Sequence, residues 1–418
     1  MGCRTNLRAS CWCSDMTHKA DRSFFKAKRI WSERKDQILG YYLVPYLPKL
    51  RTQRRPICIV DGFAGPGQFE DGNPGSPLII CRTIDSEIKK DPALRVSALL
   101  IEPDEVLFEE LKRRVQGFAF ADARRAQFLD LVPLIEERAR THSLFLYLDP
   151  FTVEGLAWEA LDRVFAYLRT GTSVEILLNF NVDSLARRGL AALTASPPEV
   201  SDEIPLPEWE PVENPILADL DRIVGGDWWQ SILLESSPYA DRVKKLTSRF
   251  CLQLHNRFKE VCFHEVREKW QHLVPKYVLV FASRHPDALE LMNDAMTKSR
   301  EALAVASATP GALFETRPEW VVPDKSKLPG LILDEARKRG PRKGLVARVI
   351  RRAFCDYASK EIRAAITELL KGGRLASATG KSRINDGVEV WAIGDQHTRP
   401  TTPPPPSPSP PPPRPRGV

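Results

Sequence analysis

A short apolar run that ends in an acid and then a glycine-rich turn stands early in the chain, at Ile57-Cys58-Ile59-Val60-Asp61-Gly62-Phe63-Ala64-Gly65-Pro66-Gly67. A run of this kind predicts a buried β-strand that leads into a loop. Because glycine has no side chain, Gly65 and Gly67 let the backbone come close to a ligand. The pattern therefore indicates a site for a nucleotide-like cofactor; an ordinary surface turn after a core strand is the alternative.

The spacing of the glycines separates two classes of cofactor. A dinucleotide-binding turn has a third glycine three residues after the second, where the pyrophosphate approaches, but Glu70 stands there. A carboxylate beside a pyrophosphate is unfavourable, so NAD is disfavoured. The pattern formed by Asp61, Phe63, Gly65 and Gly67 resembles the D-x-F-x-G-x-G turn of S-adenosylmethionine (SAM)-dependent methyltransferases, particularly those acting on amino groups of nucleic-acid bases. This resemblance implies SAM as the cofactor.

Further apolar runs follow, each with a polar residue at or near its end. The runs are 96–101, 126–129, 144–148 and 174–180, with Glu102, Asp130, Asp149 and Asn179 as the polar residues. Strands that alternate with helical patterns predict a mostly parallel sheet with helices on both faces, which binds ligands at the carboxyl ends of its strands. Glu102 is the predicted ligand of a ribose diol, through two charge-assisted hydrogen bonds. Asp130 is a second candidate for cofactor binding, although one or two of these polar residues are expected to be caps or turn formers.

Asp149-Pro150-Phe151 is the candidate catalytic motif. It resembles the motif of base-amino methyltransferases, in which Asp or Asn precedes two prolines and an aromatic residue. The resemblance implies that Asp149 and the carbonyl of Pro150 hold the target amine while Phe151 stacks on the base. This chain has one proline where the motif has two. The alternative is that Asp149 and Pro150 simply end a strand.

The order of the motifs resembles one family over roughly residues 24 to 394. The matching segments are Trp31-Ser32-x-x-Lys35, Asp61-Gly62-Phe63-Ala64-Gly65-Pro66-Gly67, Gly75-Ser76-Pro77, Asp149-Pro150-Phe151, Gly155-Leu156-x-Trp158, Asn179-Phe180 and the run from Tyr277 to Pro286. They are similar to the three-Cys-motif partner (TcmP) proteins. The resemblance implies an α/β fold with a Rossmann-like class I SAM-methyltransferase sheet and a C-terminal winged helix. It also implies a partner protein that bears a three-cysteine, radical-SAM-like motif.

The opening segment of the family pattern supplies two more candidates. Lys35 and Trp31 could close over the cofactor from an N-terminal helix. An exposed lysine and a packed tryptophan are the more common outcome for such residues, and we expect that outcome here.

The cysteines and histidines predict no metal site. Of the eight cysteines, only Cys11 and Cys13 are closely spaced, and this C-x-C pair lacks a second pair or a histidine cluster. Cys58 and Cys81 stand in apolar surroundings and are expected to be small core residues. Scattered cysteines without a secretory or transmembrane run indicate a reducing cytoplasm and no membrane association.

Length and proline content indicate several segments in the 418 residues. Pro318 and Pro323 interrupt the pattern and place a boundary near 316–325. An insertion at 183–237 contains Trp209, Trp228 and Trp229, and we expect it to be a packed cap rather than a lid or a partner surface. We predict a leader at 1–23 that is disordered or precedes a true start at Met16, a methyltransferase-like domain at 24–320 with an insertion at 183–237, a winged helix-turn-helix domain at 324–394, and a disordered proline-rich tail at 395–418.

The basic charge of the chain is local. Residues 324–394 contain 16 Lys and Arg and 8 Asp and Glu, a net charge of +8, whereas the whole chain has +7. Apolar spacing there predicts three helices, Gly372-Gly373 ends the third, and 374–378 with 388–393 predict a two-stranded wing. A local basic excess suggests docking to DNA or RNA through phosphate contacts. Winged helices also bind proteins, and that alternative stays open.

Three functions remain open at this point. The first is a cytoplasmic SAM-dependent methyltransferase that acts on a nucleic-acid base amine or on a substrate delivered by the partner protein. The second is a non-catalytic methyltransferase-like partner or regulator of the three-cysteine protein, which the single proline of the Asp149 motif favours. The third, a hydrolytic nuclease, is disfavoured because the acids stand on separate strand tips in methyltransferase order.

Overall fold

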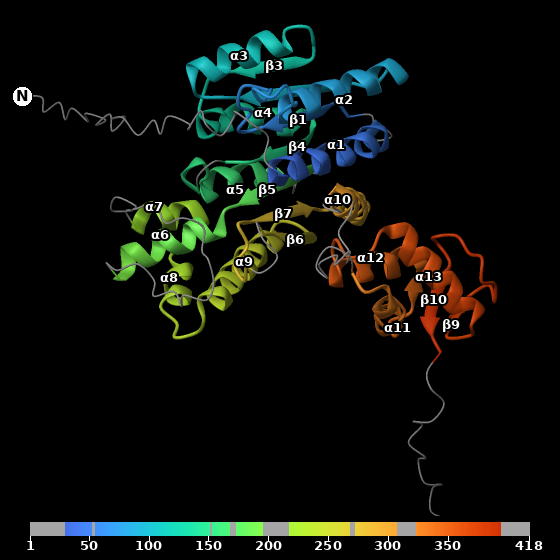
Figure 1. The fold of residues 1–418 in the computed structure, drawn as a ribbon. Helices are drawn as coiled ribbons and strands as arrows, with labels where there is room; N and C mark the ends of the chain where they lie inside the picture. The colour runs from blue at the N-terminus through green and yellow to red at the C-terminus, as the bar shows by residue number, and fades with distance from the viewer. Residues whose placement is uncertain are drawn as a thin grey trace, which may run out of the picture.

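A seven-stranded sheet forms the centre of the computed structural model, which describes residues 30–51, 55–150, 153–167, 173–194, 217–267, 272–306 and 323–393 (Figure 1). The strand order is β3-β2-β1-β4-β5-β7-β6. The strands are β1 (Ile57–Asp61), β2 (Val96–Ile101), β3 (Ala121–Arg124), β4 (Ser143–Leu148), β5 (Val174–Phe180), β6 (Glu260–Val266) and β7 (Tyr277–Ser283). Strand β7 runs antiparallel to both neighbours, whereas the pairs from β3 to β5 are parallel. The predicted α/β class with a Rossmann-like, mostly parallel sheet is confirmed.

Helices cover both faces of the sheet, because successive side chains of a strand point to opposite faces and both sets are apolar. In β1, Ile57 and Ile59 belong to one core cluster while Cys58 and Val60 belong to the other. The first cluster includes α1 (Ile30–Arg51), α2 (Ser76–Lys90), α3 (Glu105–Val115) and α10 (Pro286–Ala306). The second includes α4 (Val132–Thr141), α5 (Trp158–Ala166), α6 (Val182–Thr194), α7 (Leu217–Val224), α8 (Trp228–Leu233) and α9 (Tyr239–His255).

The prediction of the third strand was wrong. Ala121–Arg124 forms β3, whereas Phe128–Leu131 is a short 3-10 helix, η2. Strand β3 lies at the edge of the sheet and pairs only with β2, so it is half-exposed and carries no apolar run. The apolar run around Phe128 exists because that side chain is buried in the core beneath the glycine turn. Asp130 is therefore not at a strand tip.

The described part of the insertion is packed into the second core cluster. Trp229 of α8 is fully buried, and its indole nitrogen donates a hydrogen bond of 2.7 Å to Asp221. A side chain at Gly189 would meet the Trp229 ring at 2.4 Å, so α6 and α8 are in close contact. Trp209 lies outside the described residues, as do the leader, the tail and most of the 316–325 boundary.

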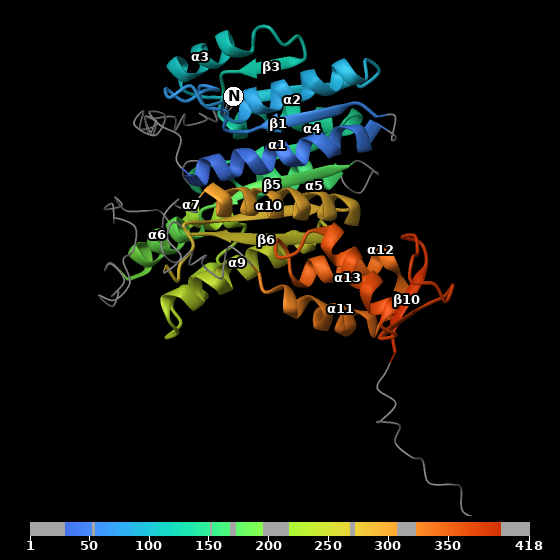
Figure 2. The same ribbon diagram turned by 45° about the vertical axis from the view of Figure 1, so that its right-hand side comes forward.

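The C-terminal unit, defined here as residues 323–393, contains η5 (Lys325–Lys327), α11 (Leu328–Ala336), β8 (Gly340–Pro341), α12 (Arg342–Arg352), α13 (Ser359–Lys371), β9 (Leu375–Ser377) and β10 (Glu389–Ala392). The three helices and the β9–β10 hairpin are confirmed, and α13 ends before Gly372 as predicted. The short strand β8 was not predicted; it makes a three-stranded antiparallel sheet in the order β8-β10-β9. Figure 2 shows this unit beside α10, at one end of the larger sheet.

Five of the eight cysteines are described, and all five are free and buried, in agreement with the core role predicted for Cys58 and Cys81. None of the helices within the described ranges combines the length and apolarity that a bilayer crossing needs.

A carboxyl group is buried in the middle of the sheet. Glu175 of β5 accepts a hydrogen bond from the hydroxyl of Tyr42, and burial raises its pKa from 4.5 to about 7. Because the folded state then holds the proton more tightly than the unfolded chain does, this group favours folding below pH 4.5. That contribution is lost as the pH rises to about 7.

Replacing Glu175 by glutamine is expected to raise the free energy of unfolding at pH 8, by up to about 3 kcal/mol. The amide keeps an acceptor for Tyr42 without a buried charge. Urea unfolding at pH 5 and pH 8 measures the effect: the difference between the two pH values should shrink in the Glu175→Gln variant. An unchanged pH dependence would contradict the assignment.

Candidate functional site

A cavity opens at the carboxyl ends of β1, β4 and β5. Its lining combines the N-terminal helix α1, the glycine turn after β1, the start of α2 and the tips of three other strands. The lining residues are Ser32, Lys35, Asp36, Phe63, Ala64, Gly65, Pro66, Gly67, Gln68, Phe69, Gly75, Ser76, Asp149, Pro150, Asn179, Asn181, Lys276 and Tyr277. Five predicted site residues are therefore brought together: Phe63, Gly65, Gly67, Asp149 and Pro150.

The glycine turn has the backbone that its sequence predicts. Gly65 and Gly67 have φ values of 60° and 83°, a region that L side chains rarely adopt. The amide of Gly75 donates a hydrogen bond of 2.9 Å to the carbonyl of Gly67, which holds the turn against the start of α2. The turn therefore presents bare backbone to the cavity.

Asp61 lies directly beneath the cavity wall rather than in it. Its carboxyl group is fully buried and accepts hydrogen bonds from the hydroxyl of Ser76, at 2.7 Å, and from the amide of Phe63, at 3.3 Å. Burial raises the pKa of Asp61 to about 7, although both hydrogen bonds oppose the shift. In this structure Asp61 fixes the turn to α2, with Ser76 between it and the cavity.

Glu102 follows β2 and is also buried. One carboxyl oxygen accepts the amide hydrogen of Gly65 and the other that of Asp104, each at 2.8 Å. Burial raises the pKa of Glu102 to about 7. A carboxylate oxygen can accept two hydrogen bonds, so each oxygen keeps capacity for one more donor. Glu102 is not among the residues that line the cavity, and in this structure it anchors the glycine turn. Its contact with a ribose diol stays a prediction.

Asp149 is held by two side chains from different elements. The ammonium of Lys35 donates to both carboxylate oxygens, at 2.7 and 2.6 Å, and the amide of Asn179 donates to one of them, at 2.7 Å. Lys35 is buried, and its ammonium lies 5.1 Å from the centre of the Tyr277 ring. The expectation of an exposed Lys35 was wrong: α1 crosses the sheet so that this residue reaches the tip of β4. The side chain of Trp31 lies outside the described side chains.

Two hydrogen-bond acceptors at the cavity retain capacity. Three hydrogen bonds reach the Asp149 carboxylate, which has about four acceptor positions. The side-chain oxygen of Asn179 is buried without a hydrogen-bond partner. A buried acceptor without a donor is unfavourable by about 1–3 kcal/mol, so a ligand that donates N–H groups there would be favoured.

The structure does not place the other predicted site residues, Asp130 and Phe151, at the cavity. Asp130 is exposed in η2 and is not among the lining residues. Phe151 lies outside the described residues. Asn179 was predicted at a strand end without a role, and no role was predicted for Ser76 or Tyr277. The sequence did contain a signal for these residues, because all three stand in segments that resemble the family pattern. Within the described ranges no cluster of three or more metal-ligating side chains occurs.

Comparisons with known proteins give structural likeness at low identity. No family model matches the sequence, and no curated protein matches it either. Among solved structures, an rRNA methylase from Streptococcus thermophilus has a TM-score of 0.29 and 9% identity, covering 59% of this chain and 94% of its own. Human methyltransferase-like protein 13 in complex with SAH has a TM-score of 0.30 and 12% identity, covering 69% and 97%. PKMT2 from Rickettsia typhi in complex with AdoHcy has a TM-score of 0.27 and 9% identity, covering 80% of this chain and 75% of its own. Such values support no statement about function, which is argued below from the site.

Proposed function

We propose that this chain is a SAM-dependent methyltransferase that acts on an amine of a nucleic-acid base or of a substrate delivered by a partner protein. One observation carries the proposal: a single cavity joins the glycine turn after β1 to Asp149-Pro150 after β4. These are the two segments that the sequence assigns to the cofactor and to the acceptor amine. Adjacent strand tips at the carboxyl edge are where such a sheet binds its ligands.

The residues present fit SAM. The turn at Gly65 and Gly67 lines the cavity and offers backbone without side-chain obstruction. Glu102 lies behind this turn, with one acceptor position left on each oxygen, and would reach the ribose hydroxyls from there. Bound SAM supplies a methyl group on a sulfonium, which a nucleophilic acceptor can take. Asp61 supports the turn from below through Ser76.

The residues on the other side of the cavity fit an amine. Asp149 and the unpartnered oxygen of Asn179 offer acceptors to an N–H donor. Two acceptors on one side of an amine fix its orientation and direct its lone pair away from them. Lys35 holds the Asp149 carboxylate in one position, which makes it a positioning residue.

SAM affinity is expected to increase with pH. Burial raises the pKa of Glu102 and of Asp61 to about 7, and a diol donates best to an ionised carboxylate. Between pH 6 and pH 8 the ionised fraction of a group with this pKa rises about tenfold. Calorimetry across this range should therefore show tighter binding at high pH, with a smaller dependence in Glu102→Gln. Equal affinity at both pH values would contradict a role for ionised Glu102.

Methyl transfer is tested directly with labelled SAM. Purified protein is incubated with single-stranded and duplex DNA, with RNA and with the three-cysteine partner protein, and incorporated label is measured. The proposal predicts label in one acceptor and much slower labelling of it with Asp149→Ala. Absence of label from every acceptor, with SAM binding intact, would overturn the catalytic proposal.

The second candidate function is a non-catalytic partner of a three-cysteine, radical-SAM-like protein. The occupation of Asp149 by Lys35 and Asn179 favours it, because an incoming amine finds only part of the carboxylate free. Co-purification with the partner, unchanged by Asp149→Ala, together with no methyl transfer, would select this function.

We also propose that the C-terminal unit is a winged helix-turn-helix domain that binds nucleic acid. The order of helices and strands, α11-β8-α12-α13-β9-β10, supports the assignment. The net charge of +8 over 324–394 supports a polyanionic partner.

A further inference from the structure

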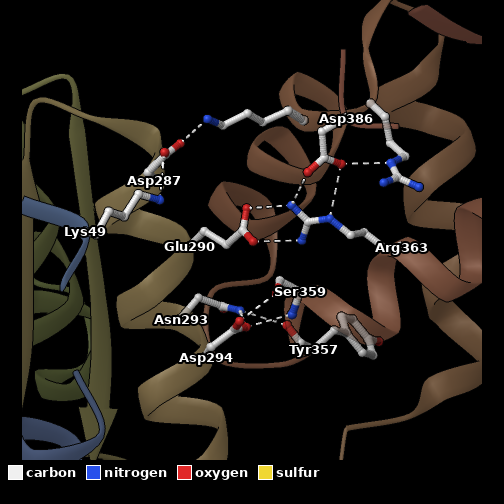
Figure 3. Close-up of polar contacts among 11 residues, drawn as sticks. Lys49, Asp287, Glu290, Asn293, Asp294, Tyr357, Ser359, Arg363 and Asp386 are labelled. Carbon is white, nitrogen blue, oxygen red and sulfur yellow. Dashed lines mark hydrogen bonds and ion pairs between the residues drawn. The ribbon is translucent and has the colours of Figure 1, made fainter. Parts of the chain in front are cut away.

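The first half of α13, the third helix of the C-terminal unit, is covered by α10. Asp294 accepts hydrogen bonds from the amide and the hydroxyl of Ser359, at 2.7 and 2.6 Å, at the start of α13 (Figure 3). Glu290 forms a bidentate ion pair with Arg363, at 2.7 and 3.0 Å. The carboxylates of α10 therefore occupy the Ser359 and Arg363 donors that this end of α13 would otherwise offer to phosphates.

The contact between α10 and the C-terminal unit is apolar and hydrogen-bonded. Met292 and Met296 of α10 are fully buried in the same apolar cluster as Ile350 and Ile362 of the unit. The side chain of Asn293 accepts a hydrogen bond from the amide of Cys355 and donates one to the carbonyl of Tyr357, both at 2.9 Å. Separating the two would expose these fully buried apolar side chains to water, which is unfavourable. A few phosphate contacts cannot offset the loss of the whole cluster, so this end of α13 is not a nucleic-acid surface.

The cations that remain for phosphates gather elsewhere. Of the sixteen Lys and Arg of the unit, ten form ion pairs within the described residues, which leaves six. Lys327 and Lys360 stand on helical segments. The other four are exposed and adjoin the three-stranded sheet: Lys338 precedes β8, Arg374 precedes β9, and Lys381 and Arg383 stand in the β9–β10 loop.

An aromatic ring stands on the outer face of that sheet. Val390 points into the core and is fully buried, so its neighbour Trp391 points outward, and it is only partly buried. The residue opposite Trp391 in the register is Ala376, whose small side chain leaves room beside the indole. The guanidinium carbon of Arg339 lies 4.3 Å from the centre of the Trp391 ring. Figures 1 and 2 both place β10 on the side of the unit away from the seven-stranded sheet.

We propose that this outer face binds single-stranded nucleic acid, with a base stacked on Trp391 and phosphates neutralised by Lys381 and Arg383. Aromatic rings flanked by cations bind single strands because every base has a stacking face and every nucleotide a phosphate. An unpaired strand is favoured over a duplex because its bases are free to stack. This inference refines the proposed nucleic-acid role of the unit and does not depend on methyl transfer.

Fluorescence anisotropy of the full chain with labelled 20-nucleotide DNA and RNA strands, without SAM, tests the proposal. Trp391→Ala is expected to weaken binding about tenfold, within the range measured for loss of one stacked base, whereas Trp391→Phe should keep most of the affinity. Lys381→Ala/Arg383→Ala should lower the slope of log affinity against log salt by about 1.4. The double variant changes only exposed side chains, so it decides the question if Trp391→Ala fails to fold.

Two matched controls locate the surface. Lys360→Ala removes the exposed cation in the first turn of α13, and Lys112→Ala/Arg113→Ala removes two exposed cations from the distant α3. Both should bind as the unaltered chain does. A loss with Lys360→Ala equal to that of the loop variant, unchanged binding by the Trp391 and loop variants, or no binding by the unaltered chain would each overturn the proposal. SAM titration of the same samples reports separately on the cofactor site.

Discussion

Replacing Glu102 by alanine is expected to weaken SAM binding by about 100-fold or more. The proposed diol contact uses two charge-assisted hydrogen bonds, each worth about 1.5–3 kcal/mol. The same carboxylate accepts the amides of Gly65 and Asp104, so its loss also releases the glycine turn. Both effects act in the same direction, and isothermal titration calorimetry measures their sum.

The controls for this prediction separate the diol contact from the turn. Glu109→Ala removes an exposed carboxylate from the neighbouring α3 and should leave SAM affinity unchanged. Glu102→Gln keeps one acceptor oxygen and should give an intermediate affinity. Near-normal SAM binding by a folded Glu102→Ala variant would show that the ribose is held elsewhere.

Replacing Asp149 by alanine is expected to lower the rate of methyl transfer by about 100-fold or more while SAM affinity changes little. Asp149 contacts the proposed acceptor pocket rather than the glycine turn, and loss of orientation at a reacting centre has effects of this size. Lys35→Met should lower the rate in the same direction, because it removes both ammonium contacts to the carboxylate. Single-turnover kinetics on the acceptor found with labelled SAM measure the rates.

A double variant distinguishes positioning from an independent role of Lys35. If Lys35 acts only through Asp149, then Lys35→Met in the Asp149→Ala background should cause no further loss of rate. Additive losses would assign Lys35 a contact of its own with substrate or cofactor. An unchanged rate in Asp149→Ala would remove Asp149 from the mechanism and favour the non-catalytic function.

Strands with continuous apolar sequence could be predicted and those without it could not. Strands β1, β4 and β5 are buried along their whole length, so each is an apolar run of strand length. At the edges, β3 and β6 are partly exposed, and their residues give no such run. In α3, Leu107, Leu111 and Val115 are buried at helical spacing, whereas Val106 is 46% exposed because it lies off the inward stripe.

The parts of the site that lie within one sequence segment could be predicted, whereas contacts between distant segments could not. The glycine turn is local in sequence, and its positive φ values follow from glycine itself. The Lys35–Asp149 pair joins residues 114 apart and depends on how α1 crosses the sheet, which helical periodicity does not specify. The covering of α13 by α10 likewise depends on tertiary packing. A charge count therefore overestimates the cations that the C-terminal unit can offer to nucleic acid.

The most direct test of the cofactor site is calorimetric titration of SAM, and of its demethylated product, into the purified full chain at pH 8. The cavity between the glycine turn and Asp149 predicts binding of one SAM per chain with micromolar affinity, lost in Glu102→Ala. Absence of heat and of any thermal stabilisation by millimolar SAM would contradict the cofactor assignment and leave the partner role as the function to test.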